Sequence, residues 1–329
     1  MPVQPARTLG RSTVPVTPLT LGAAALGNLF TAVADDQAEA TVEAAWAAGI
    51  RSFDTAPHYG LGLSERRLGR ALAGRPRTDY TVSSKVGRIL VPCDRPGEND
   101  LAHGFAVPAD HARVWDFTAD GVRRSIEHSL TRLGLDRLDV ALLHDPDDHA
   151  EAAFHEAYPA LERLRSEGVV GAIGAGMNQT GMLTRFVTDT DVDVVLLAGR
   201  HTLLDHSGLS DLLPAAQERG VSVLAGGVFN SGLLADPRPG ARYDYAPAPG
   251  HLLSRALRLR TVVERHGVSL RAAALHYPLA HPAVVGVLIG ARSPEEVGDA
   301  AALMRRPVPS AVWDELKSEG LLPAQAPTP

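Results

Sequence analysis

Short apolar runs alternate with longer amphipathic segments along the whole chain. The apolar runs carry few polar residues on either face, which is typical of parallel strands in a sheet covered by helices. Eight such runs are predicted as strands, at residues 19–23, 52–54, 81–85, 140–143, 171–175, 192–197, 221–225 and 284–289. Between them apolar residues recur at helical spacing, which predicts helices at residues 36–48, 64–73, 119–133, 150–167 and 209–219.

Glycines mark the ends of several of these predicted helices. Gly49, Gly134, Gly168 and Gly220 each follow one, at the position where a left-handed backbone lets the chain leave a helix. A further helix is predicted within residues 310–322, before a proline-rich tail.

Eight β–α units in 329 residues predict an α/β fold of the (β/α)8 TIM-barrel type, as a single domain over residues 1–329. The alternative is a doubly wound open sheet, which usually begins with a Gly-x-Gly-x-x-Gly turn after its first strand. Residues 22–27 do not have that spacing, and Gly174-Ala175-Gly176 lies mid-chain without the third glycine. The barrel is therefore favoured.

Two of the loops that follow strands are unusually long, at residues 86–116 and 226–250. Long loops on the C-terminal face of a barrel are where binding pockets are built. We therefore expect these two loops to shape a pocket for a small-molecule substrate.

Composition narrows the classes of protein that fit. Lys and Arg number 32 against 38 Asp and Glu, a net charge of −6, which argues against nucleic acid or an anionic membrane as a partner. The single cysteine, Cys93, excludes an intramolecular disulfide and a multi-cysteine zinc site. The apolar stretch at residues 19–30 is short and broken by Gly22 and Gly27, so it is a poor membrane span or signal sequence. A cytoplasmic protein is predicted.

Three predicted strands end on a titratable residue: Asp54, Lys85 and His144. Tyr59 lies in the short loop after Asp54, and Lys85 is one of only two lysines in the chain. Each of the four has an ordinary structural interpretation, such as helix capping, packing or a solvated charge. However, the strand ends of a barrel converge on one mouth, and we therefore expect the four side chains to meet there.

These residue types suit hydride transfer coupled to proton transfer. A tyrosine has an ordinary pKa of about 10, and a lysine ammonium beside it stabilises the phenolate and lowers that pKa. A buried ammonium needs a carboxylate such as Asp54 to remain charged, and a neutral imidazole can orient the substrate oxygen. The hydride has to come from a cofactor, because no side chain supplies one.

The motifs FDTAPHYG at residues 53–60 and SERRLG at residues 64–69 resemble the signature of the aldo-keto reductases. Residues 7–22 resemble the N-terminal hairpin of that family, and LLH at residues 142–144 its fourth strand. The resemblance implies a barrel that binds NAD or NADP without a Rossmann domain. It implies Tyr59 as the general acid/base, Lys85 and Asp54 as the pair that tunes it, and His144 as the orienting residue.

A narrower resemblance is to the L-fucose and D-threo-aldose 1-dehydrogenase branch, which oxidises the anomeric carbon of a sugar to a lactone. It rests on VWDF at 114–117, DGVRRS at 120–125, HDPD at 144–147, GAGMN at 174–178, GR at 199–200 and NSGL at 230–233. One alternative is an NADPH-dependent reductase of aldehydes or ketones, with a pyridoxal-type or secondary-metabolite substrate. Another is a nucleotide-sensing binding subunit, against which the complete set of four residues argues.

The resemblance also implies positions for cofactor and substrate contacts. The predicted cofactor-binding residues are Asn178, Arg200, Asn230, Ser231, Gly232, Leu233, Gly290, Arg292 and Glu296, and the predicted substrate-pocket residues are Trp115, His201 and Phe229. The family's nicotinamide-stacking tyrosine falls on Gly226, so Phe229 is a candidate to replace it.

The residues after the eighth strand bear on the choice between NAD and NADP. Relatives that prefer NADP commonly place an arginine where Glu296 stands, and a carboxylate repels a 2′-phosphate but accepts hydrogen bonds from a free ribose hydroxyl. Alternatively, Glu296 only favours the helix N-terminus, and Arg292 remains able to pair with a phosphate. NAD is favoured.

A metal site at residues 144–149 is disfavoured, because Pro146 directs a turn there.

Overall fold

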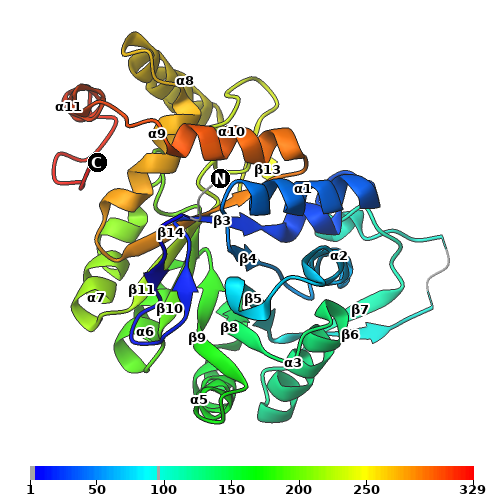
Figure 1. Cartoon of the computed structure of the whole chain (residues 1–329). Helices are drawn as coiled ribbons and strands as arrows, with labels where there is room; N and C mark the ends of the chain where they lie inside the picture. The colour runs from blue at the N-terminus through cyan, green and yellow to red at the C-terminus, as the bar shows by residue number, and fades with distance from the viewer. Residues whose placement is uncertain (1–3, 95–96) are drawn as a thin grey trace.

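Eight parallel strands close into a barrel in the computed structural model of the chain, which describes residues 4–94 and 97–329 (Figure 1). In chain order they are β3 (Leu19–Gly22), β4 (Ser52–Asp54), β5 (Thr81–Val86), β8 (Leu138–His144), β9 (Val170–Met177), β10 (Val194–Ala198), β11 (Ser222–Gly226) and β14 (Val284–Gly290). All eight predicted strands are therefore present, and the predicted (β/α)8 barrel is confirmed. Residues 1–3 of the predicted domain and residues 95–96 of the first long loop lie outside the described residues.

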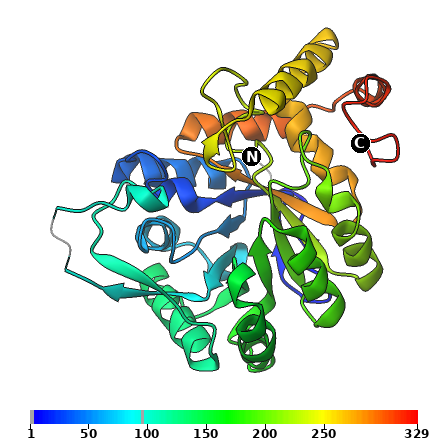
Figure 2. The same cartoon turned by 180° about the vertical axis from the view of Figure 1, so that it is seen from behind.

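Helices cover the outside of this barrel, as the opposite view in Figure 2 also shows. They are α1 (Asp35–Ala47), α2 (Leu63–Leu72), α3 (Ala119–Leu133), α4 (Ala150–Ala152), α5 (Tyr158–Ser166), α6 (Thr180–Asp189), α7 (Leu212–Arg219), α8 (Gly250–Arg265), α9 (Leu270–His276), α10 (Pro294–Met304) and α11 (Ser310–Ser318). Short 3₁₀ segments lie at Ala23–Gly27, Arg77–Asp79, Leu101–His103, Asp147–His149, Ser207–Leu209 and Tyr277–Ala280, and a π-helical turn at Ala153–Ala157. The packing of α1 against α10 joins the first and last β–α units.

Two predicted helices differ from the structure near a proline. The helix expected from residue 209 begins at Leu212, because Pro214 has no N–H and fits only within the first turn. The helix expected over residues 150–167 contains the π-helical turn just before Pro159, whose missing N–H interrupts the ordinary hydrogen-bond ladder.

The two long loops contain hairpins of their own, at the C-terminal ends of β5 and β11. The first pairs β6 (Arg88–Pro92) with β7 (His111–Trp115), which extend from the side of the barrel in Figure 1. The second pairs β12 (Arg242–Tyr243) with β13 (Ala246–Pro247) and continues into α8. Both loops therefore rise over the end of the barrel where Asp54 and His144 lie.

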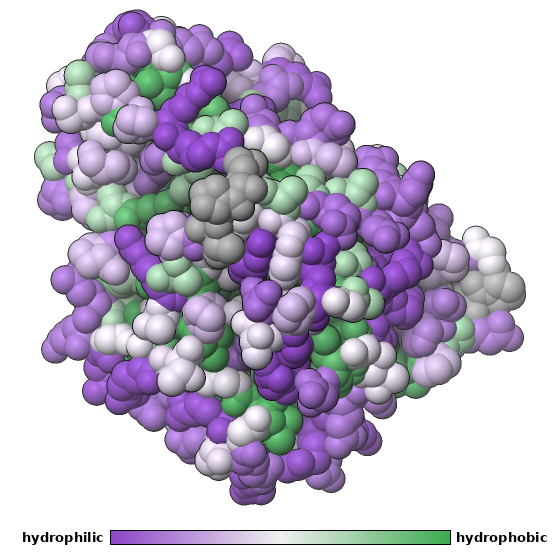
Figure 3. Space-filling view, viewed as in Figure 1, coloured by the Kyte–Doolittle hydropathy of each residue, from purple (hydrophilic) through white to green (hydrophobic). Residues whose placement is uncertain are grey.

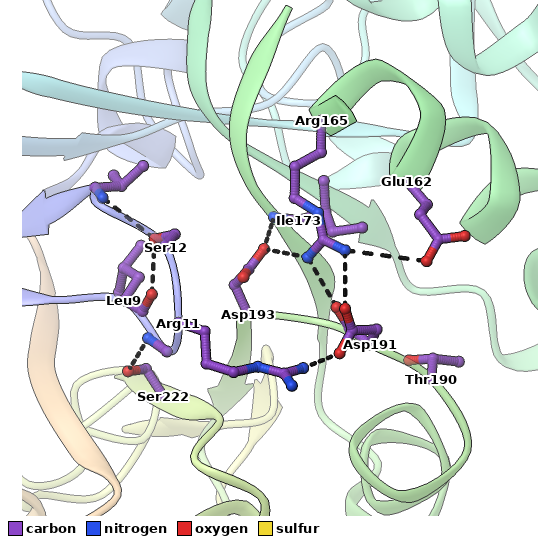
Figure 4. A network of polar contacts seen from close by, with 12 residues as sticks. Leu9, Arg11, Ser12, Glu162, Arg165, Ile173, Thr190, Asp191, Asp193 and Ser222 are labelled. Atoms are coloured by element: carbon purple, nitrogen blue, oxygen red, sulfur yellow. Dashed lines mark hydrogen bonds and ion pairs between the residues drawn. The ribbon is translucent and has the colours of Figure 1, made fainter. Parts of the chain in front are cut away.

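A third hairpin, β1 (Arg7–Thr8) with β2 (Pro15–Val16), closes the opposite end of the barrel. Its buried Leu9 packs with side chains inside the barrel, and Gly10 N donates to Ser222 Oγ at 2.8 Å, at the start of β11. Figure 4 shows the polar network beside it, in which Asp193 accepts from Arg165 at 2.8 Å and from Ile173 N at 2.9 Å. This end of the barrel is therefore closed by packing.

The surface in the view of Figure 3 is mainly hydrophilic, with hydrophobic residues in small scattered groups. None of the helices in the described part of the chain is long and apolar enough to cross a membrane.

The contact between β9 and β10 gives a stability prediction. A Cβ atom on Gly174 would lie 1.6 Å from the backbone oxygen of Val194, and neither strand can move without opening the barrel. We expect Gly174→Ala to lower the free energy of unfolding by at least about 2 kcal/mol, measured by urea denaturation. Gly181→Ala is the matched control, because that Cβ meets nothing within 4 Å, and it should stabilise α6 by about 0.5–1 kcal/mol. Equal stability of the two variants would contradict this account.

Candidate active site

The C-terminal ends of three neighbouring strands bring the predicted titratable residues together. Asp54 ends β4, Lys85 lies near the end of β5, and His144 ends β8. The register pairs Asp54 with Ser83, two residues before Lys85, and Lys85 with Leu142, two residues before His144, so the three residues lie on neighbouring strands near the same end of the barrel.

Asp54 and Lys85 form a buried ion pair. Lys85 Nζ donates to Asp54 Oδ2 at 2.7 Å and to the carbonyl of Thr55 at 2.9 Å, and each charged side chain is only 3% exposed. Ser83 Oγ donates to the other carboxylate oxygen at 2.6 Å. Burial by itself would lower the pKa of Lys85, but Asp54 and Tyr59 raise it above its ordinary value. The ammonium is therefore held charged in the barrel interior.

Tyr59 lies over this ion pair, with Lys85 Nζ 4.8 Å from the centre of its ring and the ring of His144 5.9 Å away. Its loop packs tightly on the segment after β3, because Gly27 and Gly60 have no side chains to separate the two backbones. Burial raises the pKa of Tyr59 to about 12, although Lys85 acts to lower it. The expectation of a lowered phenol pKa was therefore wrong for the net shift, since desolvation outweighs the ammonium.

His144 is held by an arginine that the sequence patterns did not single out. Arg88 Nη1 lies 3.3 Å from His144 Nδ1, and its other terminal nitrogen donates to Asp145 Oδ2 at 2.8 Å. A guanidinium only donates, so Nδ1 accepts and the ring hydrogen is on Nε2. Burial, then the charges of Arg88 and Lys85, hold the pKa of His144 well below its ordinary value, so the imidazole is neutral. In a chain with 30 arginines, only the position of Arg88 three residues after Lys85 could have indicated this role.

A cavity of about 490 Å³ runs from Asp54 and Tyr59 to the N-terminus of α10. Of the residues predicted for cofactor or substrate, those that line it are Asn178, Phe229, Asn230, Ser231, Gly232, Gly290, Arg292 and Glu296. Lining residues that the sequence did not predict include Leu29 and Phe30 on the loop after β3, Asp244 and Tyr245 in the β12–β13 hairpin, and Arg271 on α9.

Arg200 and Leu233 were predicted as cofactor contacts, and the structure gives them other partners. Both terminal nitrogens of Arg200 donate to Asp244, at 3.0 and 2.6 Å, so this side chain anchors the β12–β13 hairpin. Leu233 is fully buried in a hydrophobic cluster with α8, α9 and α11. Neither residue is among those that line the cavity, and their role in cofactor binding stays a prediction.

Two of the three predicted substrate-pocket residues also lie elsewhere. His201 is 1% exposed and packs on Tyr277 and His281, with ring centres 5.2 and 6.2 Å apart. Trp115 is 43% exposed and stacks on Phe117, and the Arg88 guanidinium lies 4.3 Å from its ring. Neither lines the cavity.

The end of the cavity at α10 is shaped by a helix cap. Ser293 Oγ accepts from Glu296 N, and Glu296 Oε2 accepts from Arg292 N at 2.8 Å, so both orphan donors are satisfied. The Arg292 guanidinium donates to the carbonyl of Leu29 at 2.6 Å and to Thr31. The Glu296 side chain is therefore bonded to the backbone just before the helix, and its exposed carboxylate lies at the rim of the cavity.

The shape and lining of the cavity fit an elongated ligand with a polar end. The side-chain oxygen of Asn230 is buried beside it and finds no hydrogen-bond partner among the described residues, while its amide nitrogen donates to Gly199 O at 3.1 Å. A Cβ on Gly290 would meet nothing, so the backbone there is open to close approach, and the α10 N-terminus attracts negative charge. These features suit a dinucleotide with its pyrophosphate towards α10. Within residues 4–94 and 97–329, no group of three His, Cys, Asp or Glu side chains is placed to hold a metal ion.

Comparison with known proteins identifies the class. Residues 18–319 match the sequence profile of the aldo/keto reductase family, and the chain belongs to this family of NAD(P)-dependent oxidoreductases, which act on CH–OH or carbonyl groups. The resemblance on which the site was predicted is thereby confirmed. In structure the chain is similar to the holo form of aldo-keto reductase AKR11C1 from Bacillus halodurans, with a TM-score of 0.77 and 25% identity over 98% of each chain.

Among curated relatives, the chain is 46% identical to D-threo-aldose 1-dehydrogenase of a Pseudomonas species, over 93% of this chain and 94% of that protein. It is 38% identical to pyridoxal 4-dehydrogenase of Microbacterium luteolum, over 96% and 97%. It is 33% identical to L-galactose dehydrogenase of Arabidopsis thaliana, over 90% and 86%.

The buried position of His201 gives a prediction on stability against pH. Burial lowers its pKa to about 3, so below the unfolded value of about 6.5 the unfolded chain binds a proton that the folded protein does not. The free energy of unfolding should therefore fall as the pH falls below 6.5. His201 by itself should account for a loss of about 2 kcal/mol at pH 5. Neither ring nitrogen has a well-placed hydrogen-bond partner among the described residues, so His201→Phe should be tolerated at pH 7.

Urea denaturation at pH 7 and pH 5 measures this effect. His201→Phe should lose stability less steeply than the parent, whereas the exposed control His128→Gln should follow the parent curve. If His201→Phe is as acid-sensitive as the parent, the ring does not stay neutral in the folded protein.

Proposed function

We propose that this chain is an aldose 1-dehydrogenase, which oxidises the C1 hemiacetal hydroxyl of a sugar of the L-fucose or D-threo-aldose type to a lactone. The observation that carries the proposal is Tyr59 over the buried Asp54–Lys85 pair, at one end of a cavity of about 490 Å³ that reaches α10. The 46% identity to a D-threo-aldose 1-dehydrogenase over nearly the whole of both chains supports this choice of substrate.

Residues along the cavity would hold NAD(P), which supplies a hydride acceptor when bound. Asn178 and Asn230 offer side-chain amides midway along the cavity, and Gly290 leaves room for close approach of a phosphate. Phe229 offers an aromatic face near Gly226, which ends β11 and has no side chain of its own to stack on the nicotinamide.

Tyr59 would act as the acid and base of the reaction. In oxidation its phenolate takes the proton of the C1 hydroxyl as the hydride leaves C1, and Lys85 stabilises that phenolate through its charge. Asp54 keeps Lys85 charged, so both groups set the proton affinity of Tyr59. His144, with its hydrogen on Nε2, would donate to the substrate oxygen and orient it.

The reverse reaction is the second candidate, with an aldehyde or ketone as substrate. The raised pKa of Tyr59 favours it, because a neutral phenol is the form that donates a proton to a carbonyl oxygen during reduction. The 38% identity to a pyridoxal 4-dehydrogenase adds a pyridoxal-type compound to the substrates worth testing.

NAD is the proposed cofactor rather than NADP. A 2′-phosphate needs a free basic side chain, but Arg292 is bound to Leu29 and Thr31, and Arg271 is paired with Asp299 at 2.5 Å. The carboxylate of Glu296 at the rim would repel that phosphate and accept from a ribose hydroxyl.

Absorbance at 340 nm tests the function directly, with NAD or NADP and L-fucose, D-arabinose, L-galactose or pyridoxal as substrate. Growth of the reduced-cofactor signal with a sugar is the expected result. Consumption of NADPH with aldehydes or ketones, and no reaction with any sugar, would replace the proposal by the reductase.

Tyr59→Phe removes only the hydroxyl group and should lower kcat/KM by at least about 100-fold, the size expected for acid–base catalysis. The dissociation constant of the cofactor should stay within about twofold. For the parent, kcat/KM for oxidation should rise with pH, because the reactive phenolate belongs to a group with a pKa of about 12. Unchanged turnover in Tyr59→Phe would remove the residue from the mechanism.

Glu296→Arg should move cofactor preference towards NADP. Replacing repulsion of a 2′-phosphate by a charge-assisted hydrogen bond should shift the NADP:NAD ratio of kcat/KM by about tenfold or more. Glu295→Arg is the matched control, since it adds the same charge one residue earlier but does not line the cavity. An equal shift in both variants would show a general charge effect instead of a contact at Glu296.

A further inference from the structure

The turn between β12 and β13 places a bulky residue in an unusual backbone conformation. Tyr243 pairs with Ala246, so Asp244 and Tyr245 form a two-residue turn, and their φ angles are 47° and 65°. Such turns are usually built from Asn and Gly, because other side chains are strained in the left-handed region. A strained tyrosine at a turn persists only when its surroundings hold it there.

Contacts from outside the hairpin hold this turn in place. Arg200, at the end of β10, makes the two hydrogen bonds to Asp244 already described, and Tyr245 N donates to Ser231 Oγ at 3.1 Å. Within the hairpin, Arg242 donates to the carbonyl of Tyr245 at 2.9 Å. The strained conformation is therefore fixed by three side chains.

The ring of Tyr245 faces the cavity. Tyr245 is 58% exposed as a residue, yet it is among those that line the cavity, so much of its exposed surface faces that space. Its ring centre is 6.1 Å from that of Phe30 on the loop after β3, and the Arg242 guanidinium lies 4.8 Å from the Phe30 ring. The hairpin and the loop after β3 therefore meet across the cavity mouth.

The Tyr245 ring lies beside the end of the cavity that holds Tyr59, because its neighbour Phe30 follows Leu29, which packs on the same hydrophobic cluster as Tyr59. Although the residue as a whole is 58% exposed, the groups around its hydroxyl desolvate it and raise its pKa, and the charges of Asp145, Asp244 and Lys85 also act on it. Its phenol also acts on the pKa of Tyr59. Lys85 lies near the end of β5, and Asp145 directly follows β8.

We propose that Tyr245 is a specificity-determining residue, whose ring covers the substrate end of the cavity opposite Tyr59 and contacts a hydroxyl-bearing ring of the substrate. This inference rests on the proposed function for its sugar substrate. A tyrosine suits the task, because its ring is a rigid apolar face and its hydroxyl exchanges hydrogen bonds with substrate hydroxyls. The strained turn is then needed to place the phenol of Tyr245. A glycine at this position would relieve the strain, but it would leave that side of the cavity without a ring.

Substitutions that separate the ring, the hydroxyl and the turn test this inference. Tyr245→Phe keeps the ring, Tyr245→Ala removes it, and Tyr245→Gly removes it while relieving the backbone. We expect Tyr245→Ala and Tyr245→Gly to lower kcat/KM for the sugar by about tenfold or more, chiefly through KM. Reduction of methylglyoxal, which has no ring, should change less than threefold. Tyr245→Gly should also melt at a higher temperature than the parent, so its loss of activity cannot come from misfolding.

Two controls keep the interpretation specific. Tyr243→Phe removes a phenol hydroxyl from the same hairpin, but that hydroxyl bonds to Asp205 at 3.1 Å outside the cavity, and its kcat/KM should stay within twofold. The dissociation constant for the cofactor, from fluorescence titration, should stay within twofold in every Tyr245 variant.

Two results would overturn the inference: unchanged sugar kinetics in Tyr245→Ala, or a loss of cofactor affinity as large as the loss of kcat/KM. If the parent oxidises no sugar but reduces carbonyls, the proposed function fails separately. The Tyr245 inference is then decided by the ratio of kcat/KM for benzaldehyde to that for methylglyoxal. A tenfold drop in Tyr245→Ala supports it, and an unchanged ratio overturns it.

Discussion

The buried ion pair between Lys85 and Asp54 is the interaction on which the rest of the site depends. A lone ammonium inside a barrel would be too costly to keep charged, and removal of either partner leaves an uncompensated buried charge. The pairing of β4 with β5 keeps the two charges together. It places Asp54 beside Ser83, which donates to the carboxylate, and the carbonyl of Thr55 accepts a further hydrogen bond from the ammonium. Two adjacent strands of the barrel therefore hold the charged groups that act on the proton affinity of Tyr59.

The cavity has two ends that differ in how they are built. At the catalytic end the polar groups come from strand ends, which the closed barrel holds rigidly. At the other end the backbone of Gly290 and the cap of α10 form the lining, and the basic side chains Arg271 and Arg292 are already paired. The β12–β13 hairpin joins the two regions over the top, anchored by Arg200. Different parts of the fold thus build the two ends of the cavity.

Residues of the same type have different roles in this chain. The burial of each side chain and the groups around it decide which role it has. His144 is kept neutral beside Arg88 at the mouth, whereas His201 is neutral because it is packed against Tyr277 in the core. Arg88 fixes the tautomer of a site residue, whereas Arg200 holds a hairpin. Two effects oppose each other at Tyr59: desolvation raises the pKa of its phenol more than the nearby ammonium of Lys85 lowers it.

The sequence by itself determined the barrel, the three strand-end residues of the site and Tyr59 in the loop after β4. Hydrophobic periodicity reports burial along each strand, and a motif as specific as FDTAPHYG fixes Asp54 and Tyr59 within it. Only the tertiary structure decided that His201 lies in the core, that Arg200 pairs with Asp244, and that Tyr245 reaches the cavity. These outcomes depend on long loops, whose shape follows from contacts between residues far apart in the chain. Local patterns carry no record of such contacts, because the side chains involved are equally compatible with an exposed or a buried position.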